Sequence, residues 1–163
     1  MPRSIVLGNG KTLIGLDRFG EVRDLYFPHV GLEDHVRGHY IHRLGVWADG
    51  RLSWFDGDSA WQVKIESEEE ALVSRITAFH PGLEVTLLFK DLVYNEEAVF
   101  IRRVDITNNA KRSREIKLYF GQQFELYKSH GADTAYFDPS RHTIVHYKGQ
   151  RVFMINGEME SAP

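Results

Sequence analysis

The sequence predicts an all-β protein, an antiparallel β-sandwich, on three observations. Apolar residues recur at every second position along most of the 163 residues, as they do in a strand with one buried face. Short runs of this kind are separated by turn dipeptides at the spacing of roughly 8–12 residues that is typical of sandwiches and barrels. Only residues 66–73 and 129–135 invite a helical interpretation, and neither stretch repeats with a helical period.

The expected strands begin on either side of a turn at Gly20, and a further strand covers residues 40–48. Asn-Gly and Asp-Gly favour tight hairpins, so the turn signals divide the chain into about ten to twelve strands. These signals are Asn9-Gly10, Asp49-Gly50, Asp56-Gly57, Pro81-Gly82, Asn108-Asn109, Lys148-Gly149 and Asn156-Gly157. Alternation within the longer runs places eight residues largely in the core: Val85, Leu87, Phe89, Val104, Ile106, Ile116, Leu118 and Phe120.

Composition limits the function classes that the chain can belong to. Its hydrophobic content of 42% and charged content of 26% suit one globular domain over residues 1–163. A net charge of −3 gives no electrostatic case for binding nucleic acid or an anionic membrane. Without cysteine there are no disulfides and no thiolate metal sites, and we expect no cofactor. The apolar run at residues 5–7 is too short for a signal peptide, so we expect a cytoplasmic protein.

The most informative segment is the loop at residues 26–35. Pro28 makes it rigid, Gly31 makes it permissive, and aromatic and titratable side chains crowd around them. Loops of this composition on a β scaffold commonly meet ligands or partner domains. The alternative is a well-packed hairpin connection whose aromatic residues close the edge of a sandwich. The candidate residues are Tyr26, Phe27, Pro28, His29, Glu33 and His35.

Three other patterns bear on chemistry. The histidines at positions 35, 39 and 42 have a spacing that would suit zinc on a helix, but Gly38 interrupts it before a strand, so we expect no metal site. Adjacent carboxylates, of the kind that glycoside hydrolysis requires in pairs, occur at 33–34, 68–70 and 96–97, where surface solubility explains them. Trp47, Trp54 and Trp61 recur every seven residues, either as core residues or as an aromatic surface on which a sugar stacks.

Several motifs resemble a known family. They are GNG at 8–10, LDRFG at 16–20, VRDLYFP at 22–28, VGLEDH at 30–35 and GVW at 45–47. Their order resembles the N-terminal domain of prokaryotic glycoside hydrolase family 15 proteins, which are bacterial and archaeal glucoamylases, glucodextranases and related trehalases. FIRRVDITN at 100–108 and LYF at 118–120 resemble later strands of the same domain. The resemblance covers nearly the whole chain, and residues 17–35 are its specific part.

The resemblance implies an antiparallel β-sandwich of the supersandwich type, followed by a linker and an (α/α)6 barrel. It places both catalytic glutamates of an inverting hydrolase in that barrel, so no catalytic residue is carried over to this chain. It also implies that the loop at residues 26–35 faces the barrel near its substrate entrance. Because the family's sandwich is usually longer and no closing element follows residue 155, we expect a truncated sandwich from the N-terminal part of a longer protein.

Three hypotheses follow. The first is an accessory domain of a glucoamylase-like hydrolase of α-linked glucosides, inactive alone, whose partners are the downstream catalytic domain and, through it, an oligo- or disaccharide. The second is a carbohydrate-binding module, and the third is the N-terminal domain of a disaccharide phosphorylase. Without the barrel, the aromatic half of the loop would favour a homodimer of the fragment.

Overall fold

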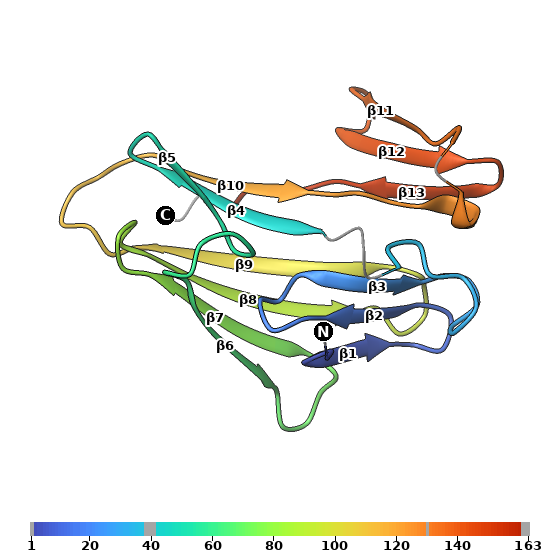
Figure 1. Ribbon diagram of the computed structural model, residues 1–163, viewed down its shortest axis with the longest axis horizontal. Helices are drawn as coiled ribbons and strands as arrows, with labels where there is room; N and C mark the ends of the chain where they lie inside the picture. Colours follow the sequence, from blue (N-terminus) through green and yellow to red (C-terminus); the bar gives the residue numbers. More distant parts are fainter. Residues whose placement is uncertain (1, 38–41, 130, 161–163) are drawn as a thin grey trace. The chain divides into compact units, whose positions relative to one another are not determined.

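The computed structural model describes residues 2–37, 42–129 and 131–160, which form thirteen β-strands and one short 3-10 helix (Figure 1). This arrangement confirms the all-β, antiparallel prediction. The chain divides into two compact units, Met1–Gln123 and Phe124–Pro163. No linker in the sequence indicates this division.

The first unit holds ten strands: β1 (Ile5–Gly8), β2 (Leu13–Leu16), β3 (Val22–Tyr26), β4 (Arg43–Ala48), β5 (Arg51–Trp54), β6 (Gln62–Ser67), β7 (Ser74–His80), β8 (Val85–Val93), β9 (Phe100–Asn108) and β10 (Ile116–Gly121). They make three antiparallel sheets with the orders β1-β2-β3, β10-β4-β5 and β6-β7-β8-β9. The turns follow the predicted signals. Gly20 has a φ of +76° between β2 and β3, and Asp49 and Gly50, at +52° and +80°, join β4 to β5 as a tight hairpin requires.

The inner sides of these three sheets share one core. The ring of Phe55, just after β5, lies edge-on to that of Phe89 on β8, with 6.0 Å between the centroids. The turn at Gly20 lies against Ile76 on β7. Both Phe55 and Phe89 are 1% exposed or less. Because Phe89 and Ile76 both belong to the sheet β6-β7-β8-β9, this sheet provides the face on which the other two pack.

Burial agrees with the prediction at the centre of the unit and departs from it at the sheet edges. Val85, Leu87 and Phe89 are completely buried. Val104, Ile116 and Leu118 are only half-buried. The prediction is wrong for Ile106 and Phe120, which are 43% and 47% exposed. Both lie on strands at the edge of their described sheets, β9 and β10, where one flank of each residue has no neighbouring strand.

The second unit is one antiparallel sheet with a short helical turn. Its elements are η1 (Leu126–Lys128), β11 (Thr134–Asp138), β12 (Thr143–Lys148) and β13 (Arg151–Ile155), with the strand order β11-β12-β13. Phe124 stacks on Phe153 at 4.9 Å between centroids and is 7% exposed. Of the two suspected helical stretches, the one at 66–73 is the end of β6 and its turn. The one at 129–135 includes a residue outside the described part of the chain, and its last two residues, Thr134 and Ala135, lie in β11.

Candidate binding surfaces

The loop at residues 26–35 is held closed by hydrogen bonds among its own residues and the two that flank Asp34 in space, Leu25 and Val36. Oδ1 of Asp34 accepts hydrogen bonds from the amides of Leu25 and Val36 at 3.1 and 3.0 Å. The amide of Phe27 donates to the carbonyl of Glu33 at 3.1 Å, and the peptide bond before Pro28 is cis. The loop is therefore a closed structure that presents a fixed surface.

The side chains predicted to form an interface are placed unevenly. Tyr26, Phe27, Pro28 and Glu33 are half-buried, and His29 is exposed. His35, which the sequence placed among the candidate interface residues, lies inside the loop. It is 1% exposed, and its Nε2 lies 2.6 Å from the carbonyl oxygen of Phe27, so it braces the loop from within.

The most exposed apolar side chains of the loop are Val30 and Leu32, at 40% and 70%. They flank Gly31, which has a φ of +83° and nothing within 4 Å of the position that a Cβ would occupy. Sequence reasoning missed them because it weighted the aromatic residues. An apolar residue on each side of a glycine at a tight turn was the available signal.

A buried polar network lies beside the loop's hairpin. Asp17 pairs with Arg23 at 2.7 Å, and Oδ1 of Asp17 accepts the amides of Phe19 and Glu21. Oε1 of Glu21 accepts the amide of Leu44 at 3.1 Å, whereas its buried Oε2 has no hydrogen-bond partner in the described part of the chain. Burial raises the pKa of Glu21 to about 7. This carboxylate is sealed in the core, away from any substrate.

His42 is a second titratable group in this core. It is 8% exposed, and its backbone bridges to Val22 on β3. Burial, with a smaller contribution from the positive charge of Arg102, lowers the pKa of His42 to about 4. The histidine is therefore neutral at physiological pH.

The three tryptophans occupy different environments. Trp61 is 6% exposed, its Nε1 donates to Oγ of Ser53 at 2.9 Å, and its ring lies 4.1 Å from that of Phe55. Trp61 is a core residue, so the sugar-stacking role considered for it does not fit. Trp47 and Trp54 are half-buried on β4 and β5 and share the outer face of their sheet, because Trp54 pairs with Gly45, two positions from Trp47.

A serine, a histidine and an aspartate meet beneath Trp61. Oδ2 of Asp58 accepts the hydroxyl of Ser53 at 2.7 Å and lies 3.0 Å from Nε2 of His80. Nδ1 of His80 accepts the amide of Leu83, so Nε2 carries the proton and donates it to Asp58. These hydrogen bonds, of which the one from His80 has the largest effect, hold the pKa of the Asp58 carboxyl well below its usual range. In a nucleophilic triad the hydroxyl faces a basic imidazole nitrogen, which is not the case here. The cluster is structural.

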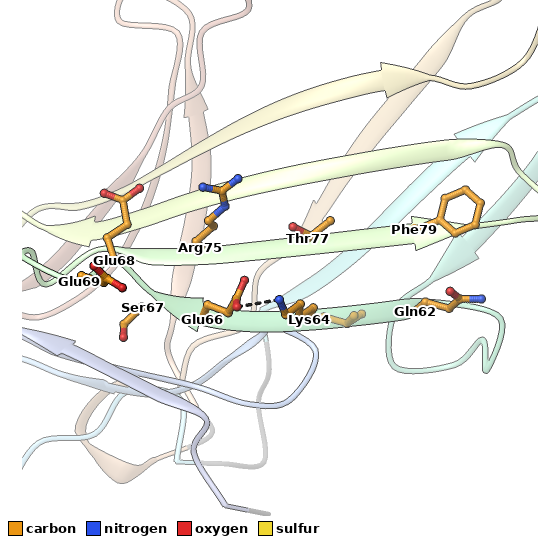
Figure 2. Close-up of a pocket in the computed structure, with 10 residues that line it drawn as sticks. Gln62, Lys64, Glu66, Ser67, Glu68, Glu69, Arg75, Thr77 and Phe79 are labelled. Atoms are coloured by element: carbon orange, nitrogen blue, oxygen red, sulfur yellow. Dashed lines mark ion pairs between the residues drawn. The ribbon is translucent and has the colours of Figure 1, made fainter.

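A shallow groove of about 900 Å³ lies over the outer face of β6 and β7 (Figure 2). Figure 2 shows Lys64 and Glu66 joined by an ion pair, with 2.7 Å between Nζ and Oε1, and Phe79 beside Gln62 at the other end. Glu68 pairs with Lys90 on β8 at 2.9 Å. The groove is thus open and polar, with a single aromatic ring and paired charges.

Among the described residues there is neither a metal-binding group of His, Cys, Asp and Glu side chains nor a membrane-crossing helix. No group of three or more His, Cys, Asp or Glu side chains among residues 2–37, 42–129 and 131–160 could hold a metal ion. His39, one of the three spaced histidines, lies outside the described residues. Within the same ranges, no helix has the length and apolar character needed to cross a bilayer.

Comparison with known proteins shows a distant similarity to a glycosyl hydrolase. No protein-family model matches the chain, and no solved structure matches it. The chain is 27% identical over 153 residues to an uncharacterized glycosyl hydrolase from Methanocaldococcus jannaschii. The match covers 94% of this chain and 24% of that protein, so the chain spans about a quarter of the relative's length.

Proposed function

We propose that this chain is a non-catalytic β-sandwich domain of a glucoamylase-like glycoside hydrolase that acts on α-linked glucosides. The observation that carries the proposal is the similarity of almost the entire chain to about a quarter of a protein named a glycosyl hydrolase. The motifs at residues 8–47 support the narrower assignment to the glucoamylase-like class. The absence of cysteine suits the reducing cytoplasm in which we place the protein.

Three glutamates of the described residues, Glu21, Glu66 and Glu68, are poorly suited to the acid and base roles in hydrolysis. Inverting hydrolysis needs a protonated carboxyl and a carboxylate on opposite sides of the bond, about 6.5–9.5 Å apart. Glu21 has the raised pKa of a general acid but is 0% exposed. The exposed Glu66 is neutralised by Lys64, and the half-buried Glu68 by Lys90. We therefore assign the acid and the base to a downstream (α/α)6 barrel.

The loop at residues 26–35 is the surface that we assign to that barrel. Its backbone is fixed by internal hydrogen bonds, so docking would cost little ordering entropy. Val30 and Leu32 offer exposed apolar area, and His29 and Glu33 add polar groups beside them. An apolar centre with a polar margin is the usual composition of a protein interface.

The first test is the reading frame beyond Pro163. A helix-rich continuation of several hundred residues with widely separated glutamates is expected. A frame that ends there, or one without such a continuation, would contradict the proposal.

The second test uses two matched leucines in the longer polypeptide. Leu32 is 70% exposed on the loop, and Leu72 is 73% exposed in the turn after β6. Leu32→Ser should loosen domain docking, measured by limited proteolysis and by kcat/KM on maltooligosaccharides, whereas Leu72→Ser should change neither. Equal effects of the two substitutions would show that the loop is not part of the interface.

A further inference from the structure

The outer face of the sheet β10-β4-β5 carries aromatic side chains where a solvated sheet face would be polar. On β4, Leu44, Val46 and Ala48 point into the core at 1% exposure or less, so the residues between them point outward. Trp47 lies on this outer side. Tyr119 on β10 and Trp54 on β5 lie opposite Gly45 from the two flanking strands. We call Trp47, Trp54 and Tyr119 the aromatic face.

The indole of Trp54 lies flat on the sheet because two strands supply glycine beneath it. A methyl group at Gly45 would lie 2.8 Å from Cε3 of Trp54 and 3.0 Å from Cδ2 and Cζ3. At Gly121 on β10, a methyl group would come within 3.8 Å of the same ring. Glycine inside a strand weakens it, and often marks a close approach by another group. Here the approaching group is the indole of Trp54, whose ring atoms lie close over both glycines.

Each indole has a cation over its ring, and each of these cations is paired with a carboxylate. Cζ of Arg43 lies 4.5 Å from the ring centroid of Trp54, and the guanidinium grips Asp56 through two nitrogens at 2.8–3.2 Å. Nζ of Lys117 lies 4.9 Å from the ring centroid of Trp47 and 3.3 Å from Glu115. The two positive and two negative charges cancel. The face therefore offers aromatic area and hydrogen-bonding groups without net charge.

We propose that the aromatic face binds a neutral oligosaccharide. The C–H side of a pyranose ring would stack on Tyr119 and on the parts of the indoles that the cations leave uncovered. Its hydroxyl groups would bond to Arg43 and Lys117, which lie over the rings, and to Asp56, the partner of Arg43. Balanced charge favours an uncharged polyhydroxylated ligand over an anionic glycan or a charged peptide. That the sugar is an α-glucan rests on the proposed function, whereas the stacking of a pyranose does not.

The groove of Figure 2 is the competing sugar surface on this chain. Its one aromatic ring, Phe79, stands apart from the paired charges at the opposite end. It lacks a ring laid flat on glycine, and so lacks the arrangement on which the proposal rests. Phe79→Ala is for this reason a control that separates the two surfaces.

The test is titration of the 163-residue chain with maltoheptaose and with cellohexaose, followed by calorimetry and tryptophan fluorescence. At least one sugar should bind at concentrations up to about 10 mM, the weak end of the measurable range. Tyr119→Ala and Trp54→Ala should each weaken binding by about tenfold or more, and Gly45→Ala should do so by lifting the indole. Phe79→Ala and Gly57→Ala should leave affinity unchanged, since Gly57 has nothing within 4 Å of its Cβ position. Thermal unfolding confirms that each variant is folded.

Binding of either sugar, or of both, supports the face as a pyranose site, and binding of cellohexaose alone would contradict only the assignment of the sugar as an α-glucan. The proposal is overturned if neither sugar binds, if binding survives Trp54→Ala and Tyr119→Ala, or if it disappears with Phe79→Ala. It is also overturned if the chain sediments as a dimer that Trp54→Ala dissociates, because the occupant would then be a second copy. None of these results alters the assignment of the chain to a glycoside hydrolase, which the reading frame tests separately.

Discussion

Arg102 and Asp91 form an ion pair with two contacts inside the sheet β6-β7-β8-β9. Nε and Nη2 of Arg102 donate to the two carboxylate oxygens at 2.8 and 2.6 Å, and Nη2 also donates to the carbonyl oxygen of Gly20 at 2.7 Å. Asp91 is 0% exposed and the Arg102 side chain 9%. One guanidinium thus ties β8 and β9 to the turn that precedes the loop at residues 26–35.

Substituting Arg102 with methionine should destabilise the chain by about 3–5 kcal/mol, since it leaves the Asp91 carboxylate buried without a partner. The neighbouring pair Arg103–Asp105 provides the control, because its side chains are 68% and 49% exposed. Arg103→Met should cost less than about 1 kcal/mol. Urea unfolding measures both free energies. Similar losses of unfolding free energy for the two variants would mean that the buried ion pair contributes no more to stability than the exposed one.

The turn at Gly20 should tolerate a side chain less well than the turn at Gly31. Both glycines have positive φ, +76° and +83°, so alanine at either should cost about 1–2 kcal/mol in backbone conformation. At Gly20 the new methyl group would also lie 2.8 Å from Cδ1 of Ile76. Overpacking adds about 1–3 kcal/mol there. Gly20→Ala should therefore lower the free energy of unfolding by more than Gly31→Ala does, as measured by denaturant unfolding. Equal losses would contradict the packing of Gly20 against Ile76.

Stability should depend on pH through two buried groups of opposite sign. The pKa of Glu21 rises from 4.5 to about 7 on folding, so the folded state binds more protons and stability falls as pH rises through that range. The pKa of His42 falls from 6.5 to about 4, so the unfolded state binds more protons and stability rises with pH there. Between pH 4.5 and 6.5 the two effects oppose each other.

Glu21→Gln should expose the effect of His42. Its stability should increase from pH 4.5 to 6.5 by about 2 kcal/mol more than that of the parent chain, allowing for some solvent access. Glu96→Gln, at an exposed position, should follow the parent profile. Urea unfolding at several pH values gives the profiles. A Glu21→Gln curve parallel to that of the parent would show that this carboxyl does not titrate as described.

The sequence was sufficient to predict the sheets but not their borders. Period-two alternation predicted that Val85, Leu87 and Phe89 are buried. The prediction is correct for these residues because β8 has a neighbouring strand on each side. The same alternation misplaced Ile106 and Phe120, because it cannot tell an edge strand from a central one. At the candidate sites, the regular interval of seven residues led us to group Trp61 with Trp47 and Trp54. Burial separates Trp61 from the other two, and the pairing register adds Tyr119, which comes from a distant part of the chain.

The central claim, that this chain has no hydrolytic activity of its own, is tested most directly by glucose release from maltooligosaccharides and trehalose. The purified 163-residue chain should release no glucose above the buffer control, because the proposal assigns both the general acid and the general base to the downstream barrel. The longer polypeptide should release it. Glucose release by the chain alone, in proportion to its concentration and retained through further purification, would contradict the account.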